Sequence, residues 1–413
     1  MKKPKLLAPA GDLNKLKVAI NYGADAVYIG GKLYGLRANA TNFDIKEMKA
    51  GADYAHQFNR EVYVTINILA HNADFEDLEQ YIKSVISTGI DGIIASDPGV
   101  ISIIRKIDKN IHISLSTQSS CTNYNTAKFW YKNGVNRIVL ARELNKKEIA
   151  EIIQNTPSEL QIEIFIHGAM CIAYSGRCLL SNIMTGRSAN GGDCAQPCRW
   201  NYYICEQTRD GQYMPVFEDE RGTYIFNSKD LCLIEYINEI IDMGVDVLKI
   251  EGRMKSEFYI ATIVGAYRKA IDTYCKDPSN YKFKKEWLDE VKKISYREYT
   301  DGFFNKKADE NSQNYATAGY IRNWEFVGTV IDYNKETKVA TVQQRNKVVT
   351  GAYIEIIGPY RKYISYTIRQ LRDMEGNIIP SAPNAMQLFC FDIDAPLKKG
   401  DIIRQKKVNK KRA

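Results

Sequence analysis

Histidine is scarce in this chain, and the motifs that commonly identify hydrolases and dinucleotide-binding enzymes are missing. The 413 residues include four histidines, His56, His71, His112 and His167, which lie far apart in the sequence. The sequence contains neither an HExxH pair nor a GxSxG motif, which excludes zinc peptidases of the HExxH type and typical α/β-hydrolases. No GxGxxG sequence follows the first expected strand, which disfavours a dinucleotide-binding fold.

Long apolar segments are missing as well. No run approaches the roughly 18 apolar residues that a membrane-spanning helix needs. The N-terminal sequence MKKPKLLAPAGD has too few consecutive apolar residues for a secretory signal. We therefore expect a cytoplasmic protein without membrane segments, whose cysteines stay reduced. In that compartment a cysteine cluster indicates metal binding or redox chemistry rather than structural disulfides.

Positive charge is concentrated at the C-terminus. The chain carries a net charge of +8, and residues 398–413 hold eight Lys or Arg and one Asp, so the remainder is close to neutral. A basic segment of this kind can contact the phosphates of a nucleic acid. A solvated chain end explains it equally well.

A short pattern recurs four times in the first 255 residues: a glycine, an apolar residue, Asp or Asn, and then an apolar run. Each copy follows a segment with helical periodicity, and its glycine suits the end of a helix. Apolar runs of this length are typical of parallel strands that are buried on both faces. With four further candidate strands the pattern makes eight strand–helix units, which predicts an α/β fold, a closed (β/α)8 TIM-like barrel. The four copies span residues 21–31, 87–97, 132–142 and 242–253, and the further strands span residues 5–11, 61–69, 112–118 and 160–168.

Polar residues follow most of the expected strands. Because chemistry in such barrels takes place at the C-terminal ends of the strands, we expect these residues to surround one pocket, although a polar residue there can also simply cap a helix. We assign five of them to substrate binding: Asn67, His71, Asp97, Gln118 and Glu143. We assign five others to catalysis: Arg142, His167, Lys249, Glu251 and Arg253.

The longest interruption of the repeat follows the seventh strand and contains four cysteines. Cys171, Cys178, Cys194 and Cys198 lie within 28 residues, with the spacing C-x6-C-x15-C-x3-C. Four thiolates without a histidine among them suit a zinc ion or an iron–sulfur cluster. Four unrelated buried cysteines are the alternative. Cys205 and Cys232 lie nearby in sequence and are alternative ligands.

Several segments resemble peptidase family U32, whose members were first described as collagenase-like proteases. They are LLAPAGD (6–12), GADAVYIGG (23–31), HGAMCIAYSGRCLLS (167–181), GGDCAQPCRW (191–200), NSKDLCLI (227–234) and KIEGRMKS (249–256). The resemblance extends from residue 6 to the basic C-terminus. It is closest to the branch of the family that hydroxylates tRNA.

This resemblance implies oxygen-independent 5-hydroxylation of the wobble uridine of tRNA, with prephenate as the hydroxyl donor. It implies a [4Fe–4S] cluster on Cys171, Cys178, Cys194 and Cys198. Cys232 is the alternative fourth ligand, because some relatives use a cysteine near that position. The resemblance also implies tRNA as a partner and a homologous U32 subunit as a further one. Two other activities stay open: hydroxylation of another RNA such as 23S rRNA, and a U32-type peptidase.

Hydroxylation with a dicarboxylate donor suggests roles for the catalytic set. Arg142 and Arg253, assisted by Lys249, are expected to bind the carboxylates. Glu251 or His167 is expected to move the proton at C5 of the uridine. A structural ion pair between Glu251 and Arg253 is the alternative.

Beyond the repeat, the sequence changes to short segments that alternate apolar and polar residues. We expect a barrel over residues 1–275 with its cysteine-containing loop at 168–226, a helical linker over 276–317, and a small antiparallel β-barrel with a basic tail over 318–413. The last domain is expected to contact RNA through exposed Lys, Arg and Tyr side chains. The alternative is that it only packs on the large barrel or forms a dimer.

Overall fold

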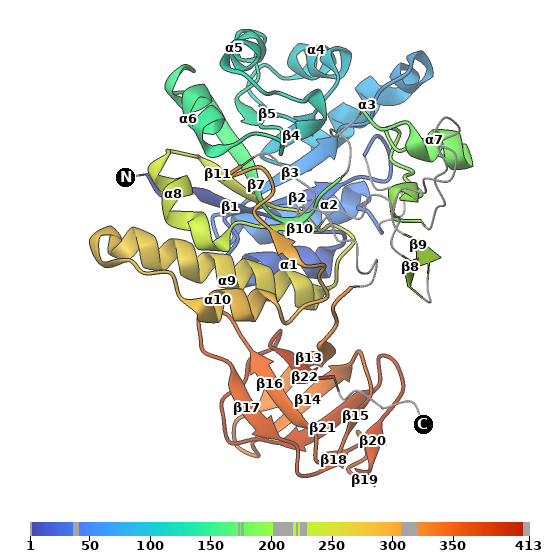
Figure 1. Cartoon of the computed structure of the whole chain (residues 1–413). Helices are drawn as coiled ribbons and strands as arrows, with labels where there is room; N and C mark the ends of the chain where they lie inside the picture. The colour runs from blue at the N-terminus through green and yellow to red at the C-terminus, as the bar shows by residue number, and fades with distance from the viewer. Residues whose placement is uncertain are drawn as a thin grey trace, which may run out of the picture.

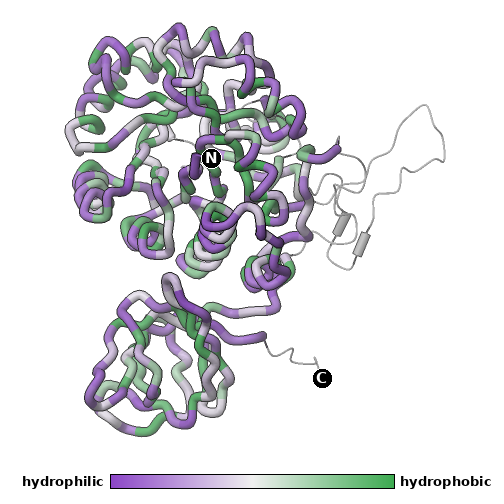
Figure 2. Tube along the Cα trace, turned by 90° about the vertical axis from the view of Figure 1, so that its left-hand side faces the viewer, coloured by the Kyte–Doolittle hydropathy of each residue, from purple (hydrophilic) through white to green (hydrophobic). Residues whose placement is uncertain are grey.

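The structure is a computed structural model, and it describes residues 2–35, 41–171, 174, 177–200, 218–219, 222–223, 229–306 and 320–407. A large barrel forms one part, and a smaller sheet from the C-terminal region lies below it in Figure 1. Figure 2 shows the same two parts from the side. Each part has its own cluster of buried apolar side chains.

Eight parallel strands form the barrel, and they are β1 (Lys5–Pro9), β2 (Ala26–Gly30), β3 (Glu61–Ile66), β4 (Gly92–Ala95), β5 (His112–Leu115), β6 (Arg137–Val139), β7 (Gln161–Ala169) and β11 (Val247–Ile250). Each strand pairs with its neighbours in chain order, and β11 pairs with both β1 and β7, which closes the sheet. The prediction of a TIM-like barrel is therefore confirmed. All four copies of the repeated pattern contain a barrel strand.

Eight helices accompany these strands, and they are α1 (Leu13–Asn21), α2 (Ile45–His56), α3 (Phe75–Ile86), α4 (Pro98–Ile107), α5 (Tyr124–Lys132), α6 (Lys146–Gln154), α8 (Ile237–Asp242) and α9 (Glu257–Lys276). Short polar side chains begin most of them. Asp12, Asp44 and Asp97 each accept a hydrogen bond from the backbone N–H three residues later, which satisfies donors that a helix otherwise leaves unpaired.

The segment between β7 and α8 departs from the simple repeat. It contains α7 (Leu180–Thr185), the two-residue strands β8 (Glu218–Asp219) and β9 (Gly222–Thr223), and β10 (Asp230–Cys232). Directly after the loop expected over residues 168–226, residues 230–232 form β10, which pairs antiparallel with the end of β7. The helix α8 starts at Ile237, after a short 3-10 turn. The apolar run DLCLI does not by itself predict this strand, because a buried strand and a buried helix start look alike over so few residues.

A linker joins the barrel to the C-terminal sheet. It contains β12 (Tyr299–Thr300) and α10 (Lys285–Val291), the latter close to the helix expected near residues 284–295. Figure 1 shows α9 and α10 between the barrel and the sheet.

Eight antiparallel strands form the C-terminal sheet, and in their order across the sheet they are β17 (Ile364–Thr367), β16 (Tyr353–Ile357), β22 (Ile402–Lys406), β13 (Trp324–Asn334), β14 (Val339–Gln344), β21 (Leu388–Asp392), β18 (Leu371–Arg372) and β19 (Ile378–Ile379). Two shorter strands, β15 (Val348–Val349) and β20 (Ser381–Ala382), form a separate pair. The prediction of an antiparallel β domain is confirmed, in the form of a strongly curled sheet.

Part of the expected basic tail is an internal strand. Arg404 lies in β22, and its guanidinium is fully buried. It donates two hydrogen bonds to Glu290 of α10, at 2.6 and 2.8 Å, and two to Glu355 of β16, at 2.8 and 2.6 Å. Lys293 joins the cluster with its Nζ 2.8 Å from Glu355. Residues 408–413 lie outside the described residues.

This ion cluster connects the linker to the C-terminal sheet. Burial alone would raise the pKa of Glu290, but hydrogen bonds and positive charge from Arg404 outweigh it and hold that pKa below its usual value. The carboxylate is therefore ionised at neutral pH and remains paired with Arg404.

No helix in the described part of the chain combines the length and apolar character needed to cross a membrane.

We predict that replacing Arg404 with alanine destabilises the protein by about 3–5 kcal/mol, because Glu355 and Glu290 then lose their common partner in a buried position. Urea unfolding followed by intrinsic fluorescence measures this loss. The matched control is Arg372→Ala, which removes an exposed ion pair with Asp392 and should cost less than about 1 kcal/mol. Equal losses in the two variants would contradict the structural role of the buried cluster.

Candidate active site at the mouth of the barrel

A cavity of about 160 Å³ lies at the C-terminal ends of the barrel strands. Side chains of β2, β7 and β11 line it, together with residues that follow β3, β5 and β6. Its lining residues from the barrel are Tyr28, Thr65, Asn67, Ile94, Ser116, Thr117, Gln118, Arg142, Phe165, Lys249, Glu251 and Arg253. The cysteine-containing loop contributes the rest of the wall.

All four clustered cysteines line this one cavity: Cys171, Cys178, Cys194 and Cys198. Cys171 is exposed, and the other three are partly buried. They are therefore not apolar filler of a core. The chemistry of four thiols on one cavity fits a metal centre of the zinc or iron–sulfur type. Within the described residues, however, no three His, Cys, Asp or Glu side chains are drawn together closely enough to hold a single metal ion.

Backbone contacts fix the cysteine loop against the barrel. The N–H of Leu69, which follows β3, donates to the carbonyl oxygen of Asn190 at 3.2 Å. Within the loop, the N–H of Ala195 donates to Ser181 Oγ at 3.0 Å. The N–H of Gln196 donates to the sulfur of Cys194 at 3.3 Å.

Lys249 projects from β11 into the barrel and is almost fully buried. Its Nζ lies 2.7 Å from Glu163 Oε1, and the carboxylate of Glu163 is completely buried. The same carboxylate lies 3.4 Å from Arg137, so one anion is shared by two cations. The rings of Tyr28 and Phe165 lie 4.6 and 5.3 Å from the Lys249 ammonium. These contacts hold the ammonium at the cavity.

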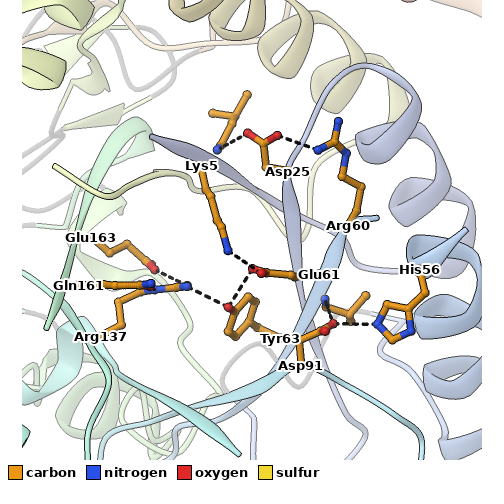
Figure 3. A network of polar contacts seen from close by, with 12 residues as sticks. Lys5, Asp25, His56, Arg60, Glu61, Tyr63, Asp91, Arg137, Gln161 and Glu163 are labelled. Atoms are coloured by element: carbon orange, nitrogen blue, oxygen red, sulfur yellow. Dashed lines mark hydrogen bonds and ion pairs between the residues drawn. The ribbon is translucent and has the colours of Figure 1, made fainter. Parts of the chain in front are cut away.

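Figure 3 shows that this charge network continues from Glu163 through Arg137 to Tyr63 and Glu61. Arg137 donates to the hydroxyl of Tyr63 at 2.8 Å, and Tyr63 donates to Glu61 at 3.0 Å. Glu61 in turn accepts from Lys5 at 2.5 Å. Alternating charges thus run through the barrel interior from β1 to the mouth.

Arg142 stacks on the ring of Phe165 and reaches Glu251. Its guanidinium carbon is 3.9 Å from the centroid of Phe165. One nitrogen donates to the carbonyl oxygen of Ala169 at 2.7 Å, and another lies 3.4 Å from Glu251 Oε2. Its Nε is buried and has no hydrogen-bond partner among the described residues.

Arg253 occupies a space that two glycines provide. The side chain is 4% exposed, and its Nη1 lies 3.3 Å from Thr65 Oγ1. A Cβ on Gly30 would stand 1.5 Å from that Nη1, and a Cβ on Gly11 would stand 2.3 Å from the carbonyl oxygen of Arg253. Any side chain at either position would displace Arg253. The glycines of the segments 6–12 and 23–31 therefore belong to the same structural unit as the KIEGR segment.

Glu251 is held by its backbone from both sides. Its N–H donates to the carbonyl oxygen of His167 at 2.8 Å, and its own carbonyl oxygen accepts from Tyr259 at 2.7 Å. Gly168 has a φ of 119°, and a Cβ there would lie 2.7 Å from Glu251 Cβ. Only glycine combines that φ with this close approach. Among the described residues, Glu251 forms an ion pair with Arg142, and the alternative pair with Arg253 that the sequence suggests does not form there.

The structure brings together six of the ten polar residues that we assign from the sequence. They line the cavity with the four cysteines: Asn67, Gln118, Arg142, Lys249, Glu251 and Arg253. His71, Asp97, Glu143 and His167 are absent from its described lining.

These four residues lie outside the cavity, each in a different environment. His71 is exposed and precedes a 3-10 turn. Asp97 caps α4 by accepting from the N–H of Val100 at 3.0 Å. Glu143 is partly buried, and burial raises the pKa of its carboxyl group. His167 is 1% exposed and hydrogen-bonds with Tyr267 at 3.3 Å, with Tyr259 and Tyr299 also against its ring.

His167 is neutral in this environment. Burial lowers its pKa to about 3, and the positive charge of Lys255 adds to the effect. An imidazole with this pKa carries no charge at neutral pH. It also faces the aromatic side chains of α9 rather than the cavity.

Cys232 likewise lies apart from the cavity-lining cysteines. It is a β10 residue, 7% exposed, and its sulfur lies 3.8 Å from the hydroxyl of Tyr267. Burial raises the pKa of its thiol to about 11, so the thiol is protonated at neutral pH. The fifth candidate, Cys205, lies outside the described residues.

Sequence reasoning missed Thr65 and Glu163. Both are inside apolar runs that predict buried strands, and both prove to contact a catalytic candidate, Arg253 and Lys249 respectively. A glutamate in the middle of such a run, QIEIFIHG, is the one signal that the sequence offers, because a fully buried carboxylate needs a cationic partner.

Comparison with known proteins agrees with this geometry. The sequence pattern of "Peptidase family U32" matches residues 11–314, and that of "Peptidase family U32 C-terminal domain" matches residues 322–404. The chain is 43% identical to tRNA hydroxylation protein P1 of Bacillus subtilis, over 98% of this chain and 96% of that protein. It is 36% identical to tRNA hydroxylation protein P of Escherichia coli, over 93% and 92%. It is also 36% identical to the 23S rRNA 5-hydroxycytidine C2501 synthase of Escherichia coli, over 73% of this chain and 45% of that protein.

Matches of this extent, over both the barrel and the C-terminal sheet, place the chain in a family: it belongs to peptidase family U32.

Proposed function

We propose that this protein is a tRNA hydroxylase that forms 5-hydroxyuridine at the wobble position, with prephenate as the hydroxyl donor and a [4Fe–4S] cluster on Cys171, Cys178, Cys194 and Cys198. One observation carries the proposal. The four cysteines and three basic side chains, Arg142, Lys249 and Arg253, line a single cavity at the catalytic end of a TIM-like barrel. The two relatives described above that match more than 90% of this chain are named tRNA hydroxylation proteins, which supports the choice of tRNA.

The cysteines are the part of the site that suits an iron–sulfur cluster. Four thiol side chains from one loop face the cavity, and thiolates are the ligands that such clusters require. When bound, a cluster supplies redox chemistry that the amino-acid side chains here lack. Cys198 lines the cavity and Cys232 does not, which favours Cys198 as the fourth ligand.

The basic side chains suit an anionic co-substrate. Arg142 is held by Glu251 and Ala169, Arg253 by Thr65, and Lys249 by a carboxylate that it shares with Arg137. Guanidinium groups bind carboxylates in a bidentate manner. Because prephenate carries two carboxylates, Arg142 and Arg253 bind it, and Lys249 contributes positive charge.

Glu251 is the group that moves the proton at C5 of the uridine. Its carboxylate lines the cavity and lies 3.4 Å from Arg142, where it can accept a proton from a base bound in the cavity. His167, the other sequence candidate, is buried among aromatic side chains and cannot exchange protons with a base in the cavity.

The position of His167 also disfavours a cysteine peptidase. Such an enzyme needs a histidine that activates the cysteine nucleophile. The histidine closest in sequence to Cys171 is His167, which hydrogen-bonds with Tyr267 instead. Hydroxylation of 23S rRNA is the stronger second candidate, because a relative with that name matches 73% of this chain.

Nucleoside mass spectrometry tests the choice of substrate. We expect tRNA from a strain that lacks the gene to lose 5-hydroxyuridine and its derivatives, and 23S rRNA to keep its modifications. Complementation with this chain should restore the tRNA nucleoside. Loss of a modified nucleoside from 23S rRNA alone would identify ribosomal RNA as the substrate. Purification of the tagged chain from the complemented strain would reveal a homologous U32 subunit if activity requires one.

We predict that Cys171→Ser, Cys178→Ser, Cys194→Ser and Cys198→Ser each abolish iron binding. Anaerobically purified wild-type protein should contain iron and absorb broadly near about 400 nm, and these variants should do neither. Cys390→Ser, in the C-terminal sheet, is the control and should keep both properties. If Cys232→Ser loses iron and Cys198→Ser keeps it, Cys232 is the fourth ligand. Wild-type protein that contains zinc but no iron would refute the iron–sulfur cluster.

We predict that Arg253→Ala lowers 5-hydroxyuridine formation by about 10²-fold or more, the effect of losing one well-placed charged contact in a closed site. The iron content should stay unchanged, which separates loss of co-substrate binding from loss of the cluster. The control is Arg60→Ala, which removes a partly exposed arginine paired with Asp25 near the opposite end of the barrel. Normal activity of Arg253→Ala would remove this residue from the site.

A further inference from the structure

A groove of about 890 Å³ extends from the mouth of the barrel to the C-terminal sheet. One wall consists of the segment after β11 and the start of α9, including Lys255 and Tyr259. The other consists of residues at the start of the C-terminal domain, including Tyr320, Arg322 and Trp324. Neither domain forms this groove alone.

The groove is continuous with the barrel cavity. Both are lined by Cys171, Cys194, Cys198, Glu251 and Arg253. The cavity, at about 160 Å³, is smaller than the range of about 300–1,000 Å³ that is usual for small-molecule pockets. A polynucleotide whose reacting base enters the cavity must therefore leave its adjoining nucleotides outside, and the groove is the space that adjoins the opening.

Basic and aromatic side chains alternate along the groove. Lys255 lies 4.5 Å from the ring centroid of Tyr320, and the guanidinium of Arg322 lies 5.7 Å from the same ring. Trp324 and Phe326 are partly exposed beside them, and Lys407 extends the basic surface. Among the described residues of the lining, the carboxylates are Glu251 and Glu325, against four cations. Positive charge that follows a backbone, combined with rings on which bases stack, is the arrangement that binds single-stranded nucleic acid.

The two walls contact each other directly: the ring of Phe258 in α9 stacks on that of Phe326 at 5.9 Å, and Arg345 lies 3.7 Å from Glu257. Lys293 lies over the ring of Trp324 at 4.7 Å, and Arg404 lies 5.4 Å from it. Both cations belong to the buried cluster with Glu290 and Glu355. The groove is therefore preformed, which lowers the cost of ordering the site on binding.

We propose that this interdomain groove binds the single-stranded RNA segment that flanks the reacting nucleotide. Arg322, Lys255 and Lys407 contact phosphates, and Tyr320 and Trp324 offer rings to the bases. The inference rests on the proposed function for the identity of the RNA, and it adds where that RNA lies and gives the C-terminal domain a direct role in substrate binding.

Binding of the full-length protein to fluorescently labelled tRNA, measured by anisotropy at several salt concentrations, tests the groove. The test variant is Arg322→Glu with Lys407→Glu, two exposed side chains on the groove. The control is Lys335→Glu with Lys399→Glu, two exposed lysines in turns of the same domain that do not line it. Both double variants change the net charge equally, so a difference between them reports position rather than total charge.

We expect the groove variant to bind at least about tenfold more weakly, with a salt dependence reduced by about one to two phosphate contacts. The control variant should bind within about twofold of the wild type. Equal effects in the two variants, or wild-type binding by the groove variant, would overturn the inference while hydroxylation of tRNA by the wild type stands. Wild-type protein that binds no tRNA would refute both proposals. If polyglutamate of equal charge displaces tRNA, the groove binds an acidic polypeptide instead.

Discussion

The buried carboxylate of Glu163 is the interaction on which the mouth of the barrel depends. A fully buried, isolated carboxylate would be strongly destabilising, and here it lies between Lys249 at 2.7 Å and Arg137 at 3.4 Å. Through Arg137 and Tyr63 the same network reaches Glu61 on the far side of the barrel interior. Because removing one member would leave the others with uncompensated charge, the ammonium of Lys249 is fixed at the cavity by contacts that extend through the barrel. The positive end of the site is thus part of the fold's own charge balance.

Glycines perform a comparable task for Arg253. The space that Gly30 and Gly11 leave is filled by the guanidinium and the carbonyl oxygen of this residue. Three sequence segments, 6–12, 23–31 and 249–256, are distant in the chain, yet β1 lies between β2 and β11 in the closed sheet. Closure of the barrel therefore brings the three segments together, and Arg253 contacts both of the others. An arginine that is 4% exposed beside a polar cavity combines low mobility with a retained charge, which suits recognition of a carboxylate.

The sequence was sufficient for the barrel and for the group of side chains after its strands, because the repeated glycine–apolar–Asp pattern specifies both period and direction. It was insufficient for His167. Where β11 pairs with β7, Lys249 pairs with Phe165 but Ile250 pairs with His167, so the register shifts by one residue at this point. Such a bulge reverses the alternation of side chains: Glu163 and Phe165 face the barrel interior, whereas His167 faces Tyr267 of α9. The buried position of Cys232 could not be predicted for a similar reason. DLC forms a short strand that pairs with the end of β7, and Cys232 lies opposite His167 there. Neither bulge nor pairing leaves a periodic signal in a single sequence.

Charge links the cysteines, the barrel and the C-terminal sheet. Thiolates are stabilised by nearby cations, and a cluster held by four of them carries net negative charge, as does a dicarboxylate co-substrate. The three basic residues of the cavity would oppose both in the proposed function, and Glu251 is the one carboxylate among the described residues of the lining. The phosphates of an RNA would add a third negative component, and the cations that face them, Lys255, Arg322 and Lys407, lie in the adjoining groove rather than in the cavity. In the function that we propose, separate sets of cations would hold the small anions in the barrel while the polynucleotide binds and leaves in the groove. Because Arg322 and Lys407 come from the C-terminal domain, this separation requires the second domain, and the ion cluster around Arg404 that connects this domain to α10 is consequently part of the architecture of the active site.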